Sequence, residues 1–177
     1  MKIKPEVLLK KIDQVFFYKK ILITGSDESL MSHVKDYIIT EFKKNNHFID
    51  FSGSYNKGSL SGDLFSNKKI LFLMKEYPSK VDYDEIADSD EQNFLIVSPN
   101  SKKTSSVKSK LSKSKIDLVV ECYTLNRSAK ELVLRGFVED NNILLSSEVF
   151  WYILENFDNS YTLFVKQLEL LNLFSNK

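Results

Sequence analysis

The sequence is poor in cysteine and arginine, and it has no long apolar run. Cys122 is its only cysteine, which excludes an intramolecular disulfide and a cysteine-based metal cluster. Its only arginines are Arg127 and Arg135, which argues against a surface built on bidentate arginine contacts to phosphates. No apolar run reaches membrane-spanning length, and no N-terminal signal peptide is evident. We therefore expect a cytoplasmic protein without a membrane partner.

Charge and length set further bounds. The chain of 177 residues has 25 lysines and arginines against 24 acidic residues, a net charge of +1, and 42% of its residues are hydrophobic. These values predict a folded protein with no overall attraction to nucleic acid or membranes. The length suits one α/β domain and a small second unit.

The stretch from Ser59 to Met74 combines two patterns. Ile70 to Met74 is an unbroken apolar run, as expected for a strand buried on both faces of a parallel sheet. Before it, Leu60, Leu64 and Phe65 fall at helical spacing. Leu64 and Phe65 would therefore lie where a short helix ends, close to a surface. Two large apolar side chains there need a partner, either in the core or on another protein.

Strands and helices alternate up to about residue 123, which predicts a mainly parallel sheet with helices on both faces. Ser26 is expected to be the N-cap of the helix that follows the first of these strands. The expected strands are 21–25, 48–51, 70–74, 94–97 and 116–121. The expected helices are 5–18, one that starts at Ser26 and frays at 43–46, and further helices at 82–87 and 102–115.

From about Thr124 only helical patterns remain, so we expect an α/β domain over 1–123 and a three-helix unit over 124–177. The last helix is apolar nearly all round, and such a helix is normally covered on several sides. We therefore expect a further domain or another subunit to pack against it. The expected inward-facing residues are Ala129, Leu132, Val133, Gly136 and Phe137, then Val149, Phe150, Ile153, Leu154 and Phe157 in a helix capped by Ser146, and finally Leu163, Phe164, Leu168, Leu171 and Phe174, with Val165, Leu170 and Leu173 widening the last stripe.

The strand–Gly25–helix turn stands where nucleotide-binding α/β proteins hold phosphate. A phosphate loop needs several glycines, then Lys and Ser or Thr. The sequence from Thr24 to Ser29 lacks the second glycine and the lysine, and Asp27 and Glu28 would repel a phosphate. No magnesium-binding acidic pair follows a buried strand. We expect no cofactor, no metal site and no catalytic residues.

The two histidines and a lysine-rich stretch are the other candidate sites in the sequence. His33 and His47 have no spacing that would join them as ligands, so both are expected to be exposed surface histidines. The stretch 102–115 holds six lysines, of which Lys102, Lys103, Lys108 and Lys110 could contact DNA phosphates. No aromatic residue is interleaved for base stacking, and a charge run is usually only a solvated helix face.

Three segments together resemble the delta subunit of the bacterial DNA polymerase III clamp loader. They are Ile21 to Glu28, where a strand ends in a turn without a phosphate loop, Asp63 to Leu73, and Lys166 to Leu171. In the last segment Gln167 replaces an acidic residue of the family and Leu170 replaces a lysine. The resemblance covers nearly the whole chain, and it rests on the order and spacing of these three signals.

The resemblance implies an AAA+-like α/β domain followed by a helical lid, without the family's collar domain. It implies no intrinsic enzymatic activity, in a subunit of a DNA polymerase III holoenzyme whose nucleotidyltransferase activity resides elsewhere. The implied partners are the sliding clamp (beta subunit), the other clamp-loader subunits and, indirectly or weakly, DNA. The family's clamp-contact pair maps onto Leu64 and Phe65, so the subunit would bind the clamp and help to open it.

Two alternatives stay open from the residues themselves. The first is a nucleotide-binding enzyme with a degenerate phosphate loop. The second is a nucleic-acid-binding module that uses the lysine-rich helix.

Overall fold

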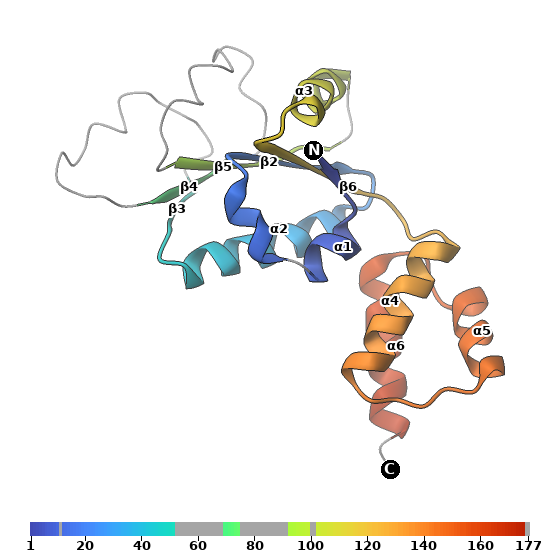
Figure 1. Ribbon diagram of the computed structural model, residues 1–177. Coiled ribbons are helices and arrows are strands. Elements are labelled where there is room, and N and C mark those ends of the chain that lie inside the picture. The colour runs from blue at the N-terminus through green and yellow to red at the C-terminus, as the bar shows by residue number, and fades with distance from the viewer. Residues whose placement is uncertain (11, 52–68, 75–91, 100–101, 176–177) are drawn as a thin grey trace. The chain divides into compact units, whose positions relative to one another are not determined.

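The computed structural model describes residues 1–10, 12–51, 69–74, 92–99 and 102–175 (Figure 1). The chain divides into two compact units, Met1–Cys122 and Tyr123–Lys177. We had expected the division at residue 124. The two units are described separately below.

The first unit is built on a six-stranded sheet in which every pair of neighbouring strands is parallel, in the order β1-β6-β2-β5-β4-β3. This confirms the expected sheet. The two-residue strand β1 was not predicted, because a pattern needs more residues to show a period. The strands are β1 (Lys2–Ile3), β2 (Lys20–Gly25), β3 (Phe48–Asp50), β4 (Ile70–Met74), β5 (Gln92–Val97) and β6 (Asp117–Cys122).

Strand β2 lies in the middle of the sheet, between β6 and β5, and all of its residues are buried. Since all the strands run the same way, the sheet has one carboxyl edge and one amino edge. Gly25 and Cys122 pair at the carboxyl edge. Lys20, Ile70 and Gln92 begin their strands at the amino edge. Each of these edges forms a distinct surface.

Helices cover both faces of the sheet (Figure 1). Helices α1 (Pro5–Lys10) and α2 (Glu28–Lys44) lie on one face and α3 (Lys102–Lys113) lies on the other. Helix α2 turns an apolar stripe toward the sheet. The buried residues of that stripe are Leu30, Met31, Val34, Ile38, Ile39 and Phe42.

The expectation of one helix over 5–18 is wrong. The structure has α1, which ends at Lys10, and then the 3₁₀ helix η1 (Ile12–Phe17). The amide of Tyr18 bonds to the carbonyl of Val15 at 3.2 Å, which is the i, i+3 pattern of a 3₁₀ turn. Residues three apart then share a face, and both Val15 and Tyr18 are buried. The 3₁₀ turn therefore lets both side chains face the interior.

The core under α3 joins four strands to one helix. Val107 and Leu111, the two apolar residues predicted on one side of this helix, are both buried in this core. Phe72 and Phe94 stack with their centroids 5.3 Å apart. Each such side chain contributes about 1.5–3 kcal/mol on burial. The other buried members of the cluster are Leu22, Met74, Ile96 and Val119.

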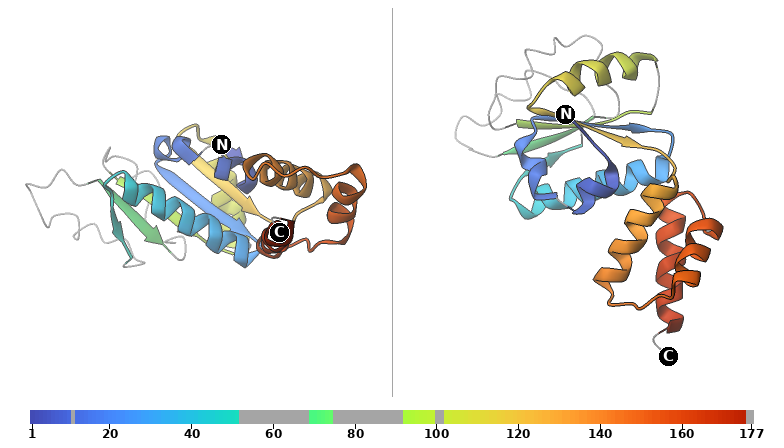
Figure 2. Two further views of the ribbon diagram at one scale, coloured as in Figure 1. Left: turned by 90° about the horizontal axis from the view of Figure 1, so that it is seen from below. Right: turned by 45° about the vertical axis from the view of Figure 1, so that its right-hand side comes forward.

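The second unit consists of three helices, α4 (Arg127–Asp140), α5 (Ser147–Asn156) and α6 (Tyr161–Ser175) (Figure 2). Asn126 caps α4, and Ser146 caps α5 as expected. The buried residues in the core of this second unit are Leu125, Ala129, Leu134, Ile153, Leu154, Phe164 and Leu168. None of the helices within the described residues combines the length and apolar character needed to cross a membrane.

The core of this unit was predicted incorrectly at some positions. Leu132 is 40% exposed, and Leu134, which was not predicted, is fully buried. Val149, Leu163 and Leu171 are 43%, 49% and 41% exposed. An apolar stripe wider than the buried face does not determine the rotation of the helix to within one residue, so the sequence could not show which of these apolar side chains are buried.

Candidate functional site

The turn that follows β2 joins two strands tightly. Gly25 has φ = +155°, and a Cβ placed there would lie 1.8 Å from the carbonyl oxygen of Cys122. The amides of Ser26 and Asp27 both donate to that same oxygen, each at 3.1 Å. Only glycine leaves room for this contact. The turn therefore packs directly against the end of β6 and does not form an open loop.

Asp27, not Ser26, is the N-cap of α2, so this detail of the sequence analysis was wrong. The Asp27 Oδ1 atom accepts the Leu30 amide at 3.0 Å and the Ser29 hydroxyl at 2.8 Å. Ser26 is an exposed residue of the preceding turn, and its amide donates to the Cys122 carbonyl. The cap places a carboxylate at the positive end of the helix.

These contacts determine the chemistry of the carboxyl edge. A phosphate site uses backbone amides and the positive helix end to attract an anion. Here two amides are already bonded to a carbonyl, and the buried Asp27 carboxylate occupies the helix end. A phosphate placed at this turn would meet a negative charge and no free amide from Ser26 or Asp27.

Cys122 supplies the carbonyl of this contact, and its thiol is chemically unreactive. Its thiol is buried. Burial, followed by the charges of Asp27 and Glu6, raises the pKa of the Cys122 thiol to about 12. The thiolate, which is the nucleophilic form, is therefore scarce at neutral pH. Within the described residues no group of histidine, cysteine and acidic side chains could hold a metal ion.

Leu64 and Phe65, the predicted clamp-contact pair, lie outside the described residues, as does the helix predicted at 82–87. The strand that follows the pair is described. The Phe48 amide bonds to the Lys69 carbonyl at 2.9 Å, and β4 then runs between β3 and β5. The chain therefore enters the sheet at a fixed point four residues after Phe65.

The lysine-rich helix α3 is described in part. The side chains of Lys102 and Lys103, at its start, lie outside the described residues. Lys108 forms an ion pair with Glu121, and this contact, with a smaller effect of Lys2, lowers the pKa of the Glu121 carboxyl. Lys110 is exposed. Of the four candidate DNA contacts, Lys108 is thus engaged within the protein, and the others are not tested by the structure.

The two histidines differ. His33 is exposed as expected, but His47 is only partly exposed. Its ring stacks against Phe16 at 6.1 Å and meets the edge of Phe42 at 4.8 Å. Burial lowers the pKa of His47, with a further contribution from the charge of Lys69. Periodicity could not predict this packing, because His47 follows the end of α2 and one of its partners, Phe16, comes from a separate segment of the chain.

A buried lysine was also missed in the helical unit. The Lys130 ammonium group donates to the carbonyls of Leu154 and Phe157 and lies 5.5 Å from the centroid of the Phe164 ring. It thereby satisfies carbonyl groups that the end of α5 would otherwise leave unpaired. Burial lowers the pKa of this group. A lysine between apolar residues is normally read as a surface residue, so the pattern concealed its role.

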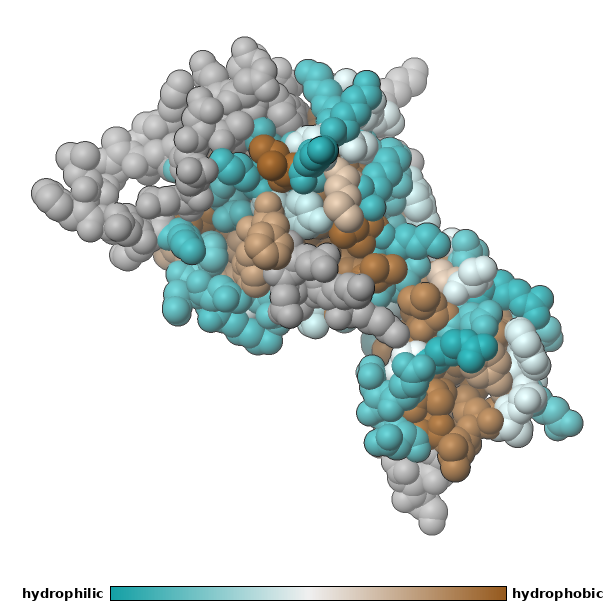
Figure 3. All heavy atoms as spheres, in the orientation of Figure 1, coloured by the Kyte–Doolittle hydropathy of each residue, from teal (hydrophilic) through white to brown (hydrophobic). Residues whose placement is uncertain are grey.

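Helix α6 leaves large apolar side chains uncovered. Leu170 and Leu173 are 54% and 68% exposed, alongside the half-exposed Leu163 and Leu171. Hydrophobic side chains are visible on the surface of the helical unit (Figure 3). These exposed leucines make α6 a candidate surface for another domain or protein.

The fold is similar to that of three solved structures. The DNA clamp loader delta protein (YqeN) of Bacillus subtilis matches with a TM-score of 0.58 at 11% identity, over 96% of this chain and 56% of its own. DnaA from Aquifex aeolicus bound to AMPPCP matches with a TM-score of 0.53 at 17% identity, over 94% and 60%. The replication initiator DnaA bound to AMPPCP and single-stranded DNA gives 0.51 at 17% identity, with the same coverage.

At these identities the likeness establishes the fold, which is the expected AAA+-like one. The chain spans 56% to 60% of the length of these proteins. No protein-family model matches the sequence, and no curated protein matches it.

Proposed function

We propose that this chain is a non-catalytic subunit of a DNA clamp loader, and that it binds a sliding clamp through Leu64 and Phe65 and helps to open it. The observation that carries the proposal is the structural likeness to a clamp loader delta protein over 96% of the chain. The same fold occurs in DnaA bound to a nucleotide analogue. The distinction between the two must therefore come from the chain's own residues.

The turn at Gly25 supports a subunit that does not use ATP. Its Ser26 and Asp27 amides bond to the Cys122 carbonyl, and its helix begins with the buried Asp27 carboxylate. A subunit built in this way needs partner subunits to supply ATP hydrolysis. The exposed apolar residues of α6 offer a surface on which such partners, or a collar domain, can pack. In this role the chain would be a cytoplasmic component of a DNA polymerase III holoenzyme.

Clamp opening requires no chemistry from this chain. Two adjacent large apolar side chains that fill a pocket on the clamp would form the centre of the interface, where single residues cost about 2 kcal/mol or more on truncation. The clamp ring opens if the surface bound by Leu64 and Phe65 fits the open ring better than the closed one. The subunit thus shifts an existing equilibrium.

The test is binding of the full chain to its cognate bacterial sliding clamp, measured by calorimetry, with the double variant Leu64→Ala/Phe65→Ala. We expect the wild type to bind and the variant to lose about 100-fold or more in affinity, as for truncation of two hot-spot residues. The variant must retain the wild-type circular dichroism spectrum.

A matched control is Phe51→Ala/Leu144→Ala. Both residues are exposed, at 62% and 100%, and this variant removes a similar apolar area. It should bind as the wild type does. Unfolding of the Leu64→Ala/Phe65→Ala variant would assign that pair to the core, and a folded wild type that fails to bind the clamp would refute the proposal.

A further inference from the structure

Helix α5 carries two aromatic residues on a side that the rest of the helical unit leaves largely open. Trp151, the only tryptophan of the chain, is 43% exposed, and Tyr152 is 62% exposed. Val149, which precedes Tyr152 by three residues, and the acidic residues Glu148 and Glu155 are exposed as well. Residues three or four positions apart are neighbours on a helix, so these five side chains form one surface, which we call the α5 face.

The core of the helical unit does not need the α5 face. Ile153 and Leu154 are buried in that core, and Phe150 packs against it. These residues already anchor α5 to its neighbours, so core packing does not account for Trp151 and Tyr152. Tryptophan and tyrosine are enriched at protein interfaces, where they often carry a large share of the binding energy.

Arg127 of α4 holds the Trp151 ring in place. The central carbon of its guanidinium group lies over the ring, 5.1 Å from the ring centre, which is the geometry of a cation–π contact. The same guanidinium group lies 4.0 Å from the Glu155 carboxylate. A ring fixed in this way loses little conformational freedom when a partner binds, and such preorganisation favours association.

The α5 face is negatively charged. Between Arg135 and Lys166 the sequence has five acidic residues and no lysine or arginine. Arg127 offsets the charge of Glu155, whereas Glu148 has no ion pair among the described residues. An acidic surface of this kind favours a partner that brings lysine or arginine to the same place.

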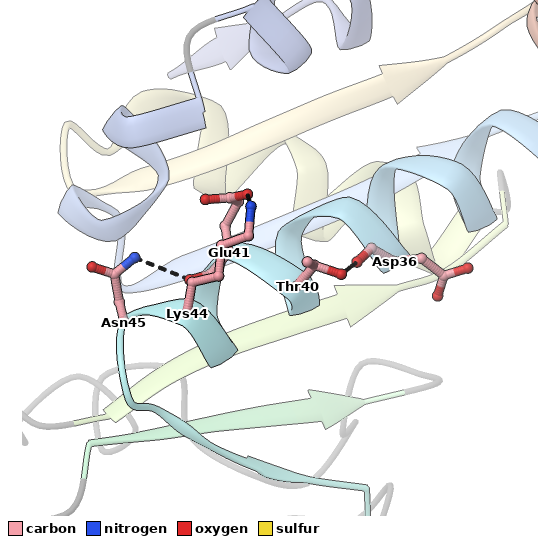
Figure 4. Close-up of polar contacts among 5 residues, drawn as sticks. All are labelled: Asp36, Thr40, Glu41, Lys44 and Asn45. Atoms are coloured by element: carbon pink, nitrogen blue, oxygen red, sulfur yellow. Dashed lines mark hydrogen bonds and ion pairs between the residues drawn. The ribbon is translucent and has the colours of Figure 1, made fainter.

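Helix α2 shows what an exposed helix face looks like when its charges are satisfied within the helix. Lys44 pairs with the Glu41 carboxylate at 2.6 Å, and the Asn45 side chain donates to the Glu41 carbonyl at 3.0 Å (Figure 4). A face like this needs only solvent. The α5 face differs, because it combines exposed aromatic rings with the carboxylate of Glu148.

Two other occupants fit the α5 face less well. Nucleic acid can stack its bases on Trp151 and Tyr152, but its phosphates need cations, and the face offers carboxylates. A second copy docked about a two-fold axis would bring the same face, and therefore like charges, together. A basic amphipathic helix has neither problem, because its apolar residues can pack along α5 while a lysine pairs with Glu148.

We propose that the α5 face binds a basic amphipathic helix of another protein, with apolar side chains of that helix against Trp151 and Tyr152 and a lysine or arginine at Glu148. The contact uses a different helix from the exposed leucines of α6, and it does not involve the predicted clamp-contact pair. It goes beyond the proposed function, since it requires neither a clamp nor partner subunits that hydrolyse ATP.

The experiment follows the fluorescence of Trp151 while the full chain is titrated with an amphipathic helical peptide of leucine and lysine. Because the chain has no other tryptophan, the signal comes from the α5 face. We expect saturable binding that weakens with salt and moves the emission to shorter wavelength as the ring leaves water. Tyr152→Ala should weaken binding about 30-fold, as for a hot-spot residue, and Glu148→Gln about 2- to 5-fold.

Two control variants on α6 separate the two helices. Glu169→Gln removes another exposed glutamate of the same unit, and Leu173→Ala removes an apolar side chain that is 68% exposed. Neither should change the affinity. Unchanged binding by Tyr152→Ala, with a loss in Leu173→Ala instead, would assign the contact to α6 and overturn the proposal.

A comparison of probes uses the wild type alone, so it decides the question even if a substitution disturbs folding. No binding of the leucine–lysine peptide would overturn the proposal. Equal binding of a leucine–glutamate peptide of the same pattern would do so too, because it would show no preference for a basic partner. An equal response of Trp151 to oligothymidylate would assign the face to nucleic acid, and an emission that changes with the concentration of the chain alone would assign it to a second copy.

Discussion

At the scale of single residues, the contact between Gly25 and Cys122 decides what the carboxyl edge of the sheet can bind. The Cys122 carbonyl lies where a side chain at position 25 would project, and it also takes the amide hydrogens of Ser26 and Asp27. A phosphate loop would offer amides of this kind to its ligand. The same atoms therefore stabilise the fold and close the turn to phosphate.

We predict that Gly25→Ala destabilises the first unit by about 2–4 kcal/mol, from the strained backbone and the overpacked contact together. The added Cβ would fall 1.8 Å from a backbone oxygen that cannot move without shifting β6. Urea unfolding followed by circular dichroism measures the change.

The neighbouring Ser26→Ala is the control for this substitution. Ser26 is exposed and is not the cap of α2, so its loss should cost less than about 0.5 kcal/mol. Equal destabilisation by both substitutions would show that the close contact between Gly25 and Cys122 has no special importance for stability. Asp27→Ala should cost about 1 kcal/mol as the loss of a true cap.

The sequence could predict a helix after Gly25 but not its first residue. Ser and Asp are about equally good caps, and both stand at the right place. The choice depends on Cys122, nearly a hundred residues later, whose carbonyl accepts the amides of both Ser26 and Asp27 and so sets where the turn ends. A contact across the sheet leaves no local signal in the chain.

At the scale of elements, the end of α5 depends on a residue of α4. Lys130 reaches two carbonyls, of Leu154 and Phe157, and is 3% exposed. Its aliphatic stem can pack with the core while its ammonium group completes the helix end. One side chain thus joins two helices of a small unit.

We predict that Lys130→Met destabilises the helical unit by about 1–3 kcal/mol. Methionine retains the stem but leaves two carbonyls without their donor, and an unpaired buried polar group costs this amount. Thermal unfolding of the full chain, followed by circular dichroism, measures the loss.

The matched control is Lys166→Met, which removes an exposed lysine from α6 in the same unit. It should leave the transition within about 0.5 kcal/mol of the wild type. A Lys130→Met variant as stable as the wild type would show that hydrogen bonds from Lys130 add nothing to the helix end.

Periodicity predicted the helices of this unit but not their phase. Leu132 and Leu134 both fit an apolar stripe, and only packing shows that Leu134 is inside. Likewise, the segment 5–18 has a helical pattern, yet it is divided into α1 and η1. The pattern reports which residues prefer burial, whereas the turn geometry follows from what they pack against.

At the scale of the whole molecule, the alternation of strands and helices was sufficient to predict the parallel sheet, and the AAA+-like fold was predicted from the resemblance to the clamp loader delta subunit. The fold constrains function only loosely, because the similar structures include both a clamp loader delta protein and DnaA bound to AMPPCP. The cavity of about 340 Å³ at the amino ends of the strands could not be predicted, since its described lining residues, from Phe16 to Asn93, come from segments that only the fold brings together. The predicted clamp-contact pair lies outside the described residues and stays a prediction.

A thermal-shift measurement distinguishes a subunit without ATP from a nucleotide-binding enzyme. We predict that Mg–ATP leaves the Tm of the full chain unchanged, because only a ligand that binds the native state raises it. The physical reason is the Gly25 turn, whose Ser26 and Asp27 amides are engaged and whose helix start is negatively charged.

A P-loop ATPase measured in parallel shows that the assay detects nucleotide binding. A rise in Tm of this chain with Mg–ATP would contradict the prediction and would favour the alternative of a nucleotide-binding enzyme with a degenerate phosphate loop. With no rise, the proposed opening of a clamp would draw its energy from two sources outside this turn. One is the clamp's own preference between its open and closed forms when bound, and the other is ATP held by partner subunits. The chain would then contribute a binding surface and no chemistry, and its role would depend on what Leu64 and Phe65 bind.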